Sequence, residues 1–359
     1  MGFAIRKGEN SMNNCLHVFV CDPTIVLRKP ISGQDFYLQR IIKVMKAKGY
    51  NVVVVSPKEM KALVNVVASF NNVLFHLHYA NLHTVMLAKT LFDRATNLLY
   101  VYQLDDPTWT RLEKLKSTMF LRITSALNLV QGYITPSYVL AKELRYIVNP
   151  KKTWVLEPYY PCRTKNSLQD IINKKIHDLE SKRLNLLIIG RINRYRIDLD
   201  LIFKVLKQLI NNDFRVTLRI VSMKEFGLST QYMSLHKDGL KLEIIGRRLT
   251  EEEKAEIFRD SHMLFFVVRG YVAMHPPLSV IESVCYATIP LVSPVVSEFR
   301  HLEDIVVENF TPSTIVEKIM RITASFETIS SKLYHVFERF YSKNYLLNQL
   351  LNIVNGVLS

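Results

Sequence analysis

Short, strongly apolar runs that recur between helical segments constrain the fold of this chain most. NVVVVS at 51–56 and MLFFVV at 263–268 are typical. Both are far shorter than the roughly 20 residues that cross a bilayer, and neither shows the alternation of a sheet with one solvated face. Each therefore predicts a strand buried on both faces of a parallel sheet. Parallel neighbours need long crossovers, which the amphipathic stretches between the runs supply as helices.

The pattern runs through two series, with a linker containing Pro158 and Pro161 between them. The predicted strands lie at 15–22, 51–57, 72–79, 97–106, 132–136, 184–191, 215–222, 241–247, 263–268 and 288–294. The predicted helices lie at 32–50, 166–183, 198–212, 250–260 and 278–287, with a further one after Ser137. Ser137 is a suitable N-cap for that helix.

A chain of 359 residues exceeds one ordinary hydrophobic core, so we expect two domains. The predicted fold is α/β, with two Rossmann-like domains in tandem and a ligand cleft between the carboxyl ends of their sheets. The predicted divisions are an N-terminal extension at 1–14, a first domain at 15–160, a linker and helix at 161–183, a second domain at 184–335, and a C-terminal helix at 336–359 that packs back towards the first domain.

The cysteines, the N-terminal residues and the charge bear on the compartment of the protein and on the charge of its partners. Cys15, Cys21, Cys162 and Cys285 show no metal-ligand spacing, so we expect four reduced, structural thiols. Residues 1–14 have no apolar core of signal-peptide length, which favours a cytoplasmic protein. The net charge is +15, and residues 1–180 carry 24 Lys and Arg against 13 Asp and Glu. This excess suits an anionic partner such as phospholipid headgroups, a lipid phosphate or nucleic acid; a lysine-rich solvated face explains it equally well.

The stretch from Leu184 to Arg300 carries the chemistry. A predicted strand ends at Gly190-Arg191, and Arg196 follows before a helix. Farther along comes MHPPLSVIESVCYATIPLVSP, with Glu282 at its centre. Together these segments resemble the donor half of GT-B glycosyltransferases of retaining family 4, and the similarity extends over residues 15–310.

The resemblance implies roles for the two arginines. A nucleoside diphosphate develops negative charge as the sugar–phosphate bond breaks, and fixed cations neutralise that charge without a metal. Arg191 and Arg196 are the candidates, with Arg196 at the position where the family usually has lysine. Alternatively, the arginines cap the strand end or pair with Asp198 or Asp200.

The later segment resembles a family motif of two acids eight positions apart. Glu282 matches the second acid, which holds the ribose hydroxyls, whereas Met274 stands where the first acid lies beside the sugar. His275 is a candidate to take over part of that role.

The helix that contains Glu282 is expected to open at Leu278, Ser279 and Val280, whose backbone N–H groups would bind phosphate. An ordinary capped helix is the alternative for this segment.

The first domain supplies weaker candidates. Gly33 lies where the family keeps glycines close to the diphosphate. Asp105 and Asp106, in a Tyr-x-x-x-Asp-Asp pattern, would bind hydroxyls or act as a base, although an N-cap explains them as well.

Two other patterns suggest a metal and are interpreted otherwise. Asp198-x-Asp200 is interpreted as a helix-start acid pair, and we expect no metal there. His76 and His78 point to the same side of a strand, and satisfied core histidines are favoured over a metal site.

The sequence therefore predicts a glycosyltransferase that moves a sugar from a UDP- or GDP-linked donor to a glycan, lipid-linked or protein acceptor. We expect retention of configuration, no cofactor and no metal. Peripheral contact with an anionic membrane is also considered, through a surface that includes Tyr102, Trp109, Phe120 and the basic residues Arg111, Lys114, Lys116 and Arg122. A solvated helix face is the favoured interpretation of these residues. The alternatives are a GT-B scaffold that binds without turnover, because of Met274, and a nucleic-acid-binding or nucleic-acid-modifying protein, which the sparse aromatic–basic interleaving does not favour.

Overall fold

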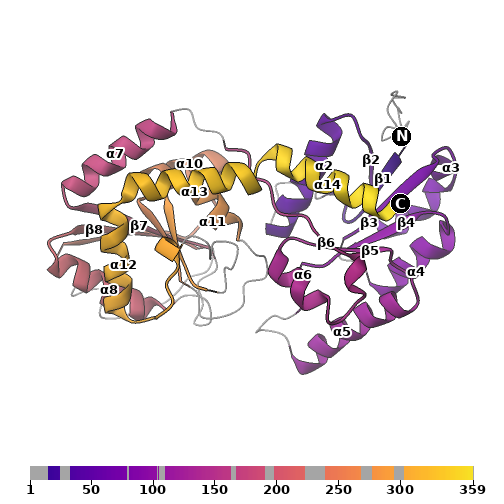
Figure 1. Cartoon of the computed structure of the whole chain (residues 1–359), viewed down its shortest axis with the longest axis horizontal. Coiled ribbons are helices and arrows are strands. Elements are labelled where there is room, and N and C mark those ends of the chain that lie inside the picture. The colour runs from indigo at the N-terminus through magenta and orange to yellow at the C-terminus, as the bar shows by residue number, and fades with distance from the viewer. Residues whose placement is uncertain are drawn as a thin grey trace. The chain divides into compact units, whose positions relative to one another are not determined.

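The computed structural model describes residues 15–24, 33–78, 81–102, 104, 110–162, 167–190, 198–222, 239–267, 277–294 and 303–358. These residues form two compact units (Figure 1). The first unit contains the described residues up to Tyr159 and those from Tyr341 onwards. The second unit begins at Tyr160 and ends at Phe340.

The first unit is built on a six-stranded parallel sheet with the order β2-β1-β3-β4-β5-β6. Its strands are β1 (Cys15–Val20), β2 (Asn51–Val55), β3 (Asn72–Leu77), β4 (Thr96–Tyr100), β5 (Gly132–Thr135) and β6 (Thr153–Val155). The five predicted strands are confirmed, although β4 ends before the predicted boundary because the apolar run continues past the last paired residue. β6 was missed, since a strand of 3 residues has no readable period.

Helices flank this sheet. They are α2 (Gly33–Ala47), α3 (Val64–Val67), α4 (Leu82–Leu91), α5 (Arg111–Ala126), α6 (Tyr138–Leu144) and α14 (Lys343–Leu358), with 3-10 turns η2 (Pro57–Leu63) and η3 (Pro150–Lys152). α14 packs against α2, and α4 packs against α5. Ser137 is confirmed as the N-cap of α6, because its Oγ accepts a hydrogen bond from the Leu140 N–H at 3.3 Å.

The two faces of this sheet differ in chemistry. Leu16, Val18 and Val20 of β1 join a hydrophobic core on one face. The alternate residues, including His17 and Phe19, point to the opposite face and are also buried. That second face carries the buried histidines described below.

The second unit is built on a five-stranded parallel sheet with the order β11-β10-β7-β8-β9. Its strands are β7 (Arg183–Ile189), β8 (Arg215–Val221), β9 (Leu240–Ile245), β10 (Met263–Phe266) and β11 (Ile289–Val292). Its helices are α7 (Leu168–Glu180), α8 (Leu199–Asn211), α10 (Glu251–Asp260), α11 (Leu278–Val284), α12 (Pro312–Ala324) and α13 (Phe326–Phe340), with the 3-10 turn η5 (Glu303–Ile305). α12 packs on α8, whereas α13 packs on α7 and α11. The predicted fold, two Rossmann-like α/β domains in tandem, is confirmed.

The strand orders place a topological switch point in each sheet. In the first unit the chain moves outwards in opposite directions from β1 and β3, and in the second from β7 and β10. Ligands of doubly wound sheets bind outside the carboxyl ends of the two strands at such a point. The order therefore indicates a candidate ligand site at the carboxyl ends of β1 and β3 in the first unit and of β7 and β10 in the second.

The expectation of four reduced thiols is wrong for two of them. Cys162 and Cys285 form a disulfide across 123 residues of sequence, while Cys15 and Cys21 are free and buried. The fold brings the segment after Tyr160 against the end of α11, a proximity that no local spacing could reveal. Among the residues that the structure describes, no helix is long and apolar enough to cross a membrane.

Candidate functional site

The carboxyl end of β7 forms one side of the switch point in the second unit. Gly190 follows β7 with φ +122°, a value that residues with a side chain rarely adopt. Its N–H donates to the Val221 carbonyl at 3.0 Å, and an added Cβ would meet nothing within 4 Å. Gly190 thus lies beside open space, where a ligand can approach its backbone closely. Arg191 and Arg196, which follow, lie outside the described residues.

Asp198 and Asp200 begin helix α8. The Asp198 side chain accepts a hydrogen bond from the Leu201 N–H at 3.1 Å, and Asp200 lies in the first turn. This confirms their interpretation as a helix-start acid pair, which favours the positive end of the helix dipole.

Glu282 lies on the other side of this switch point, on the helix that follows β10. Only 3% of the residue is exposed, and its Oε1 accepts a hydrogen bond from Lys254 Nζ of α10 at 2.9 Å. Glu282 is therefore a buried carboxylate, and it is held by a cation that the sequence did not indicate.

Lys254 remains charged in this setting. Burial opposes its charge, but the carboxylates of Glu282 and Glu251 outweigh burial and raise the pKa of Lys254. Glu251 Oε1 lies 3.1 Å from the same ammonium. The pair fixes the orientation of Glu282 within the helix.

The start of α11 is less open to phosphate than the sequence indicated. Pro277 is the N-cap and gives no side-chain cap hydrogen bond. The Val280 N–H donates to the Pro277 carbonyl at 2.9 Å. The phosphate-binding interpretation therefore rests on the Leu278 and Ser279 amides. Met274 and His275 lie outside the described residues.

The far end of α11 is fixed by the buried amino group of Lys175, on α7. Burial lowers the pKa of this group well below its usual range. Its Nζ lies within hydrogen-bonding distance of five oxygens: the carbonyls of Phe258 (3.1 Å), Ser261 (2.5 Å), Tyr286 (2.8 Å) and Ala287 (3.0 Å), and Thr288 Oγ1 (3.0 Å). Ala287 has φ +51°, a strained value for alanine, and its carbonyl is one of those held. Lys175 thus joins the end of α10 to the turn after α11. These contacts fix the positions of the two helices that carry Lys254 and Glu282.

Buried histidines and tyrosines lie on and directly after the strands at the switch point of the first unit and on the neighbouring strand β4. His76, on β3, is hydrogen-bonded through Nε2 to His17 Nδ1 at 3.0 Å and through Nδ1 to the Tyr100 hydroxyl at 2.9 Å. His78 Nδ1 lies 2.5 Å from the Tyr102 hydroxyl. The preferred interpretation as core histidines is confirmed for His76.

These rings are held neutral. Burial lowers the pKa of His17 to about 4 and the pKa values of His76 and His78 well below their usual range. The Nε2 atoms of His17 and His78 are buried without a hydrogen-bond partner among the described residues. No group of three His, Cys, Asp or Glu in the part of the chain that the structure describes is arranged to hold a metal ion.

The remaining candidates of the first unit are only partly placed. Gly33 is the first residue of α2, the helix that follows β1. Asp105 and Asp106 lie outside the described residues.

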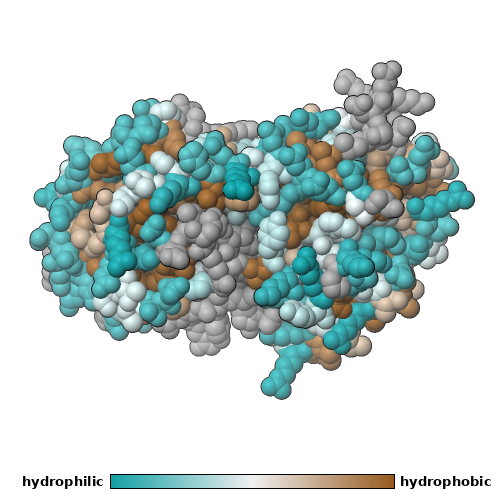
Figure 2. Space-filling view, in the orientation of Figure 1, coloured by the Kyte–Doolittle hydropathy of each residue, from teal (hydrophilic) through white to brown (hydrophobic). Residues whose placement is uncertain are grey.

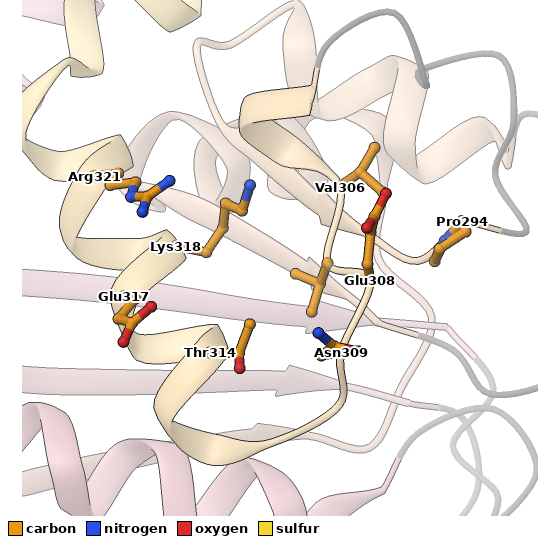
Figure 3. Close-up of a pocket in the computed structure, with 9 residues that line it drawn as sticks. Pro294, Val306, Glu308, Asn309, Thr314, Glu317, Lys318 and Arg321 are labelled. Atoms are coloured by element: carbon orange, nitrogen blue, oxygen red, sulfur yellow. The ribbon is translucent and has the colours of Figure 1, made fainter.

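A separate pocket of about 780 Å³ opens in the second unit beside α12 (Figure 3). Lys318 and Arg321 project from α12 towards it, opposite Glu308. Its charged lining residues, which include Glu317, balance two cations with two carboxylates. None of the predicted site residues that the structure describes lines this pocket, and a balanced set of described charges does not select a diphosphate.

No family model and no curated protein sequence matches this chain. Solved structures do match. A glycosyltransferase from Rickettsia africae ESF-5 superposes with a TM-score of 0.66 at 12% identity, over 96% of this chain and 98% of the other. Anabaena Alr3699/HepE, in complex with UDP and glucose, gives 0.60 at 10% identity over 95% and 99%. A UDP-forming α,α-trehalose-phosphate synthase from Burkholderia vietnamiensis gives 0.57 at 11% identity over 94% and 82%.

The chain has the GT-B fold. Identities of 10–12% establish the fold alone. The function is therefore inferred from the residues of the site. There, Gly190 and the Lys254–Glu282 pair flank the switch point of the second unit.

Sequence reasoning missed both lysines of this region. Lys254 stands in the run EEEKAEIF, which is typical of a solvated helix face, and Lys175 stands beside Lys174, whose side chain is 66% exposed. A lysine that will be buried has no local signature, because its partners come from other elements.

Proposed function

We propose that this protein is a glycosyltransferase that moves a sugar from a nucleoside-diphosphate sugar to an acceptor hydroxyl. The observation that carries the proposal is the position of Gly190 and Glu282 on the two sides of the β7/β10 switch point. A backbone that opens towards solvent and a buried carboxylate on the next helix suit a nucleotide, with phosphates near the first and ribose near the second.

In this proposal Glu282 accepts hydrogen bonds from ribose hydroxyls while Lys254 holds its orientation. Arg191 and Arg196 neutralise the diphosphate as the bond between the sugar and the phosphate oxygen breaks. The Leu278 and Ser279 amides, and Gly33 of the first unit, add phosphate contacts.

We further propose retention of configuration without a metal ion. The acceptor oxygen attacks the anomeric carbon on the face that the diphosphate leaves, and the leaving phosphate takes up the acceptor proton. Asp105, Asp106 and His275 are the candidates for binding acceptor or sugar hydroxyls. The donors proposed are UDP- or GDP-linked sugars, and HepE, which shares the fold, was solved with UDP and with UDP-glucose.

Ligand-induced thermal stabilisation tests the proposal. UDP or GDP should raise the unfolding temperature more than uridine or guanosine at equal concentration, because the diphosphate adds binding energy. Arg191→Ala should remove that difference. Arg215→Ala is the matched control, since Arg215 begins β8 at the opposite end of the same sheet and is exposed.

Nucleotide release from UDP- and GDP-sugars separates turnover from binding. Release with an acceptor present supports the enzyme. Binding of a nucleotide with no release from any donor would instead favour the non-catalytic scaffold that Met274 suggests. If no diphosphate binds more tightly than its nucleoside, the donor-site proposal is wrong.

A further inference from the structure

Helix α5 of the first unit exposes an apolar stripe to solvent. Leu112, Leu115 and Met119 are 58%, 55% and 51% exposed, and it is exposed apolar side chains that adjoin one another, rather than single ones, that mark an interaction surface. We call these three residues the α5 stripe. Leu127, directly after the helix, is 63% exposed, and the neighbouring helix α4 exposes half of Met86.

The stripe occupies a single face of the helix. Its members are spaced by three and four residues, which places them one above another at about 100° per residue. The opposite face packs on the core through Leu121 and Thr124, which are buried. The exposed face of α5 therefore carries more apolar surface than a solvated helix face usually does.

Cations border the stripe on both sides. At the same angular spacing, Arg111 and Arg122 fall along one edge and Lys116 along the other, and all three are exposed. The helix has one acidic residue, Glu113, whose carboxylate accepts hydrogen bonds from the N-cap Thr110 at 2.6 and 2.8 Å. Apolar residues bordered by cations on both sides are the pattern of a helix that lies in the interface of an anionic bilayer.

We propose that the outer face of α5 is a docking surface for an anionic lipid bilayer. The α5 stripe enters the headgroup region and the bordering cations contact lipid phosphates. A second copy of this chain fits this face poorly, because it would set Arg111, Lys116 and Arg122 against their own duplicates. In Figure 2, brown and teal residues mix along the lower edge of the first unit, where Figure 1 places α5.

The cationic excess of the chain supports the choice of lipid. The net charge is +15, so approach to a negatively charged surface is favoured over the whole molecule. Binding to a bilayer does not depend on the proposed sugar transfer, because it requires no nucleotide.

Vesicle co-sedimentation of the full chain tests the proposal. The probes are phosphatidylcholine vesicles with and without phosphatidylglycerol, at low and at physiological salt. The protein should sediment with the anionic vesicles and much less with the neutral ones. The triple variant Leu112→Ser, Leu115→Ser, Met119→Ser should bind anionic vesicles about tenfold more weakly or worse.

Two further variants keep the test decisive. Val64→Ser with Ile244→Ser is the matched control, since both residues are apolar and 46% exposed but lie on other elements. It should bind like the wild type. Arg111→Gln, Lys116→Gln, Arg122→Gln should weaken binding by roughly fivefold per cation at low salt and flatten the salt dependence. This charge variant also serves if the serine variant fails to fold.

Three results would overturn the proposal. One is a wild-type protein that does not sediment with anionic vesicles. Another is a folded serine variant that sediments as well as the wild type. The third is a dimer, seen by light scattering, that the serine variant abolishes while vesicle binding is absent, because a second copy would then cover the α5 stripe.

Discussion

The Nζ atom of Lys254 on α10 lies 2.9 Å from Oε1 of Glu282 on α11. Both side chains are largely buried, at 13% and 4% exposed. Removing one partner of a buried ion pair leaves the other charge without compensation. Lys254→Met should therefore lower the free energy of unfolding by about 3 kcal/mol.

A double-mutant cycle measured by urea unfolding checks this coupling. The double variant Lys254→Met, Glu282→Met should recover part of the loss, since it leaves no buried charge. Additive effects of the two single variants would show that the pair does not interact. Nucleoside binding should fall with Glu282→Gln if the carboxylate holds ribose.

Lys175→Met should be among the most destabilising substitutions in the second unit. It removes the amino group that lies near four carbonyl groups and the Thr288 hydroxyl, whose oxygens would lose that donor inside the protein. We expect a loss of more than about 3 kcal/mol in the free energy of unfolding.

Lys174→Met is the control for that experiment. Lys174 is the next residue on the same helix, its side chain is 66% exposed, and it pairs with Asp260. An exposed pair of this kind contributes about 0–1 kcal/mol. Similar losses for both variants would refute the structural role of the Lys175 amino group.

Reduction of the Cys162–Cys285 disulfide should destabilise the second unit. The bond closes a loop of 123 residues, and cross-links of this kind typically add about 2–4 kcal/mol to stability. Unfolding with and without a thiol reductant measures the difference. Cys162→Ala with Cys285→Ala should abolish the effect of the reductant.

The free cysteines provide the internal control. Burial raises the pKa values of Cys15 and Cys21 to about 12, which keeps both thiols protonated and unreactive. Alkylation of the folded, non-reduced protein should therefore modify none of these four cysteines, and reduction should expose only Cys162 and Cys285. Rapid alkylation of Cys162 before reduction would contradict the disulfide.

The sequence predicted the elements that depend on local pattern. Runs such as NVVVVS are short and uniformly apolar, so β2 and its equivalents were identified. The strand order could not be read from the chain, because it depends on which distant runs pair. The switch points emerge only from that order.

The same limit applies to the site. Gly190 and Glu282 stand in recognisable local patterns. The contact of Lys254 with Glu282, in contrast, forms only because α10 lies beside α11. The disulfide was missed for this reason too. A cysteine in an apolar run, such as Cys285, is equally consistent with a free buried thiol.

Acid should unfold the first unit through its buried histidines. Above pH 6.5 these rings are neutral in both states and contribute nothing to pH dependence. As the pH falls below 6.5, only the unfolded chain takes up protons, since burial holds the pKa of His17 at about 4 and keeps those of His76 and His78 low. Stability is then lost at about 1.4 kcal/mol per pH unit for each ring, down to its folded pKa.

His17→Phe should reduce this slope by the contribution of one ring. His335→Ala should leave it unchanged, because the His335 side chain is 81% exposed. Urea unfolding between pH 6.5 and pH 4.5, followed in both variants and in the wild type, measures the slopes. Equal slopes for His17→Phe and the wild type would mean that His17 is protonated in the folded protein, which its burial beside His76 and Tyr50 argues against.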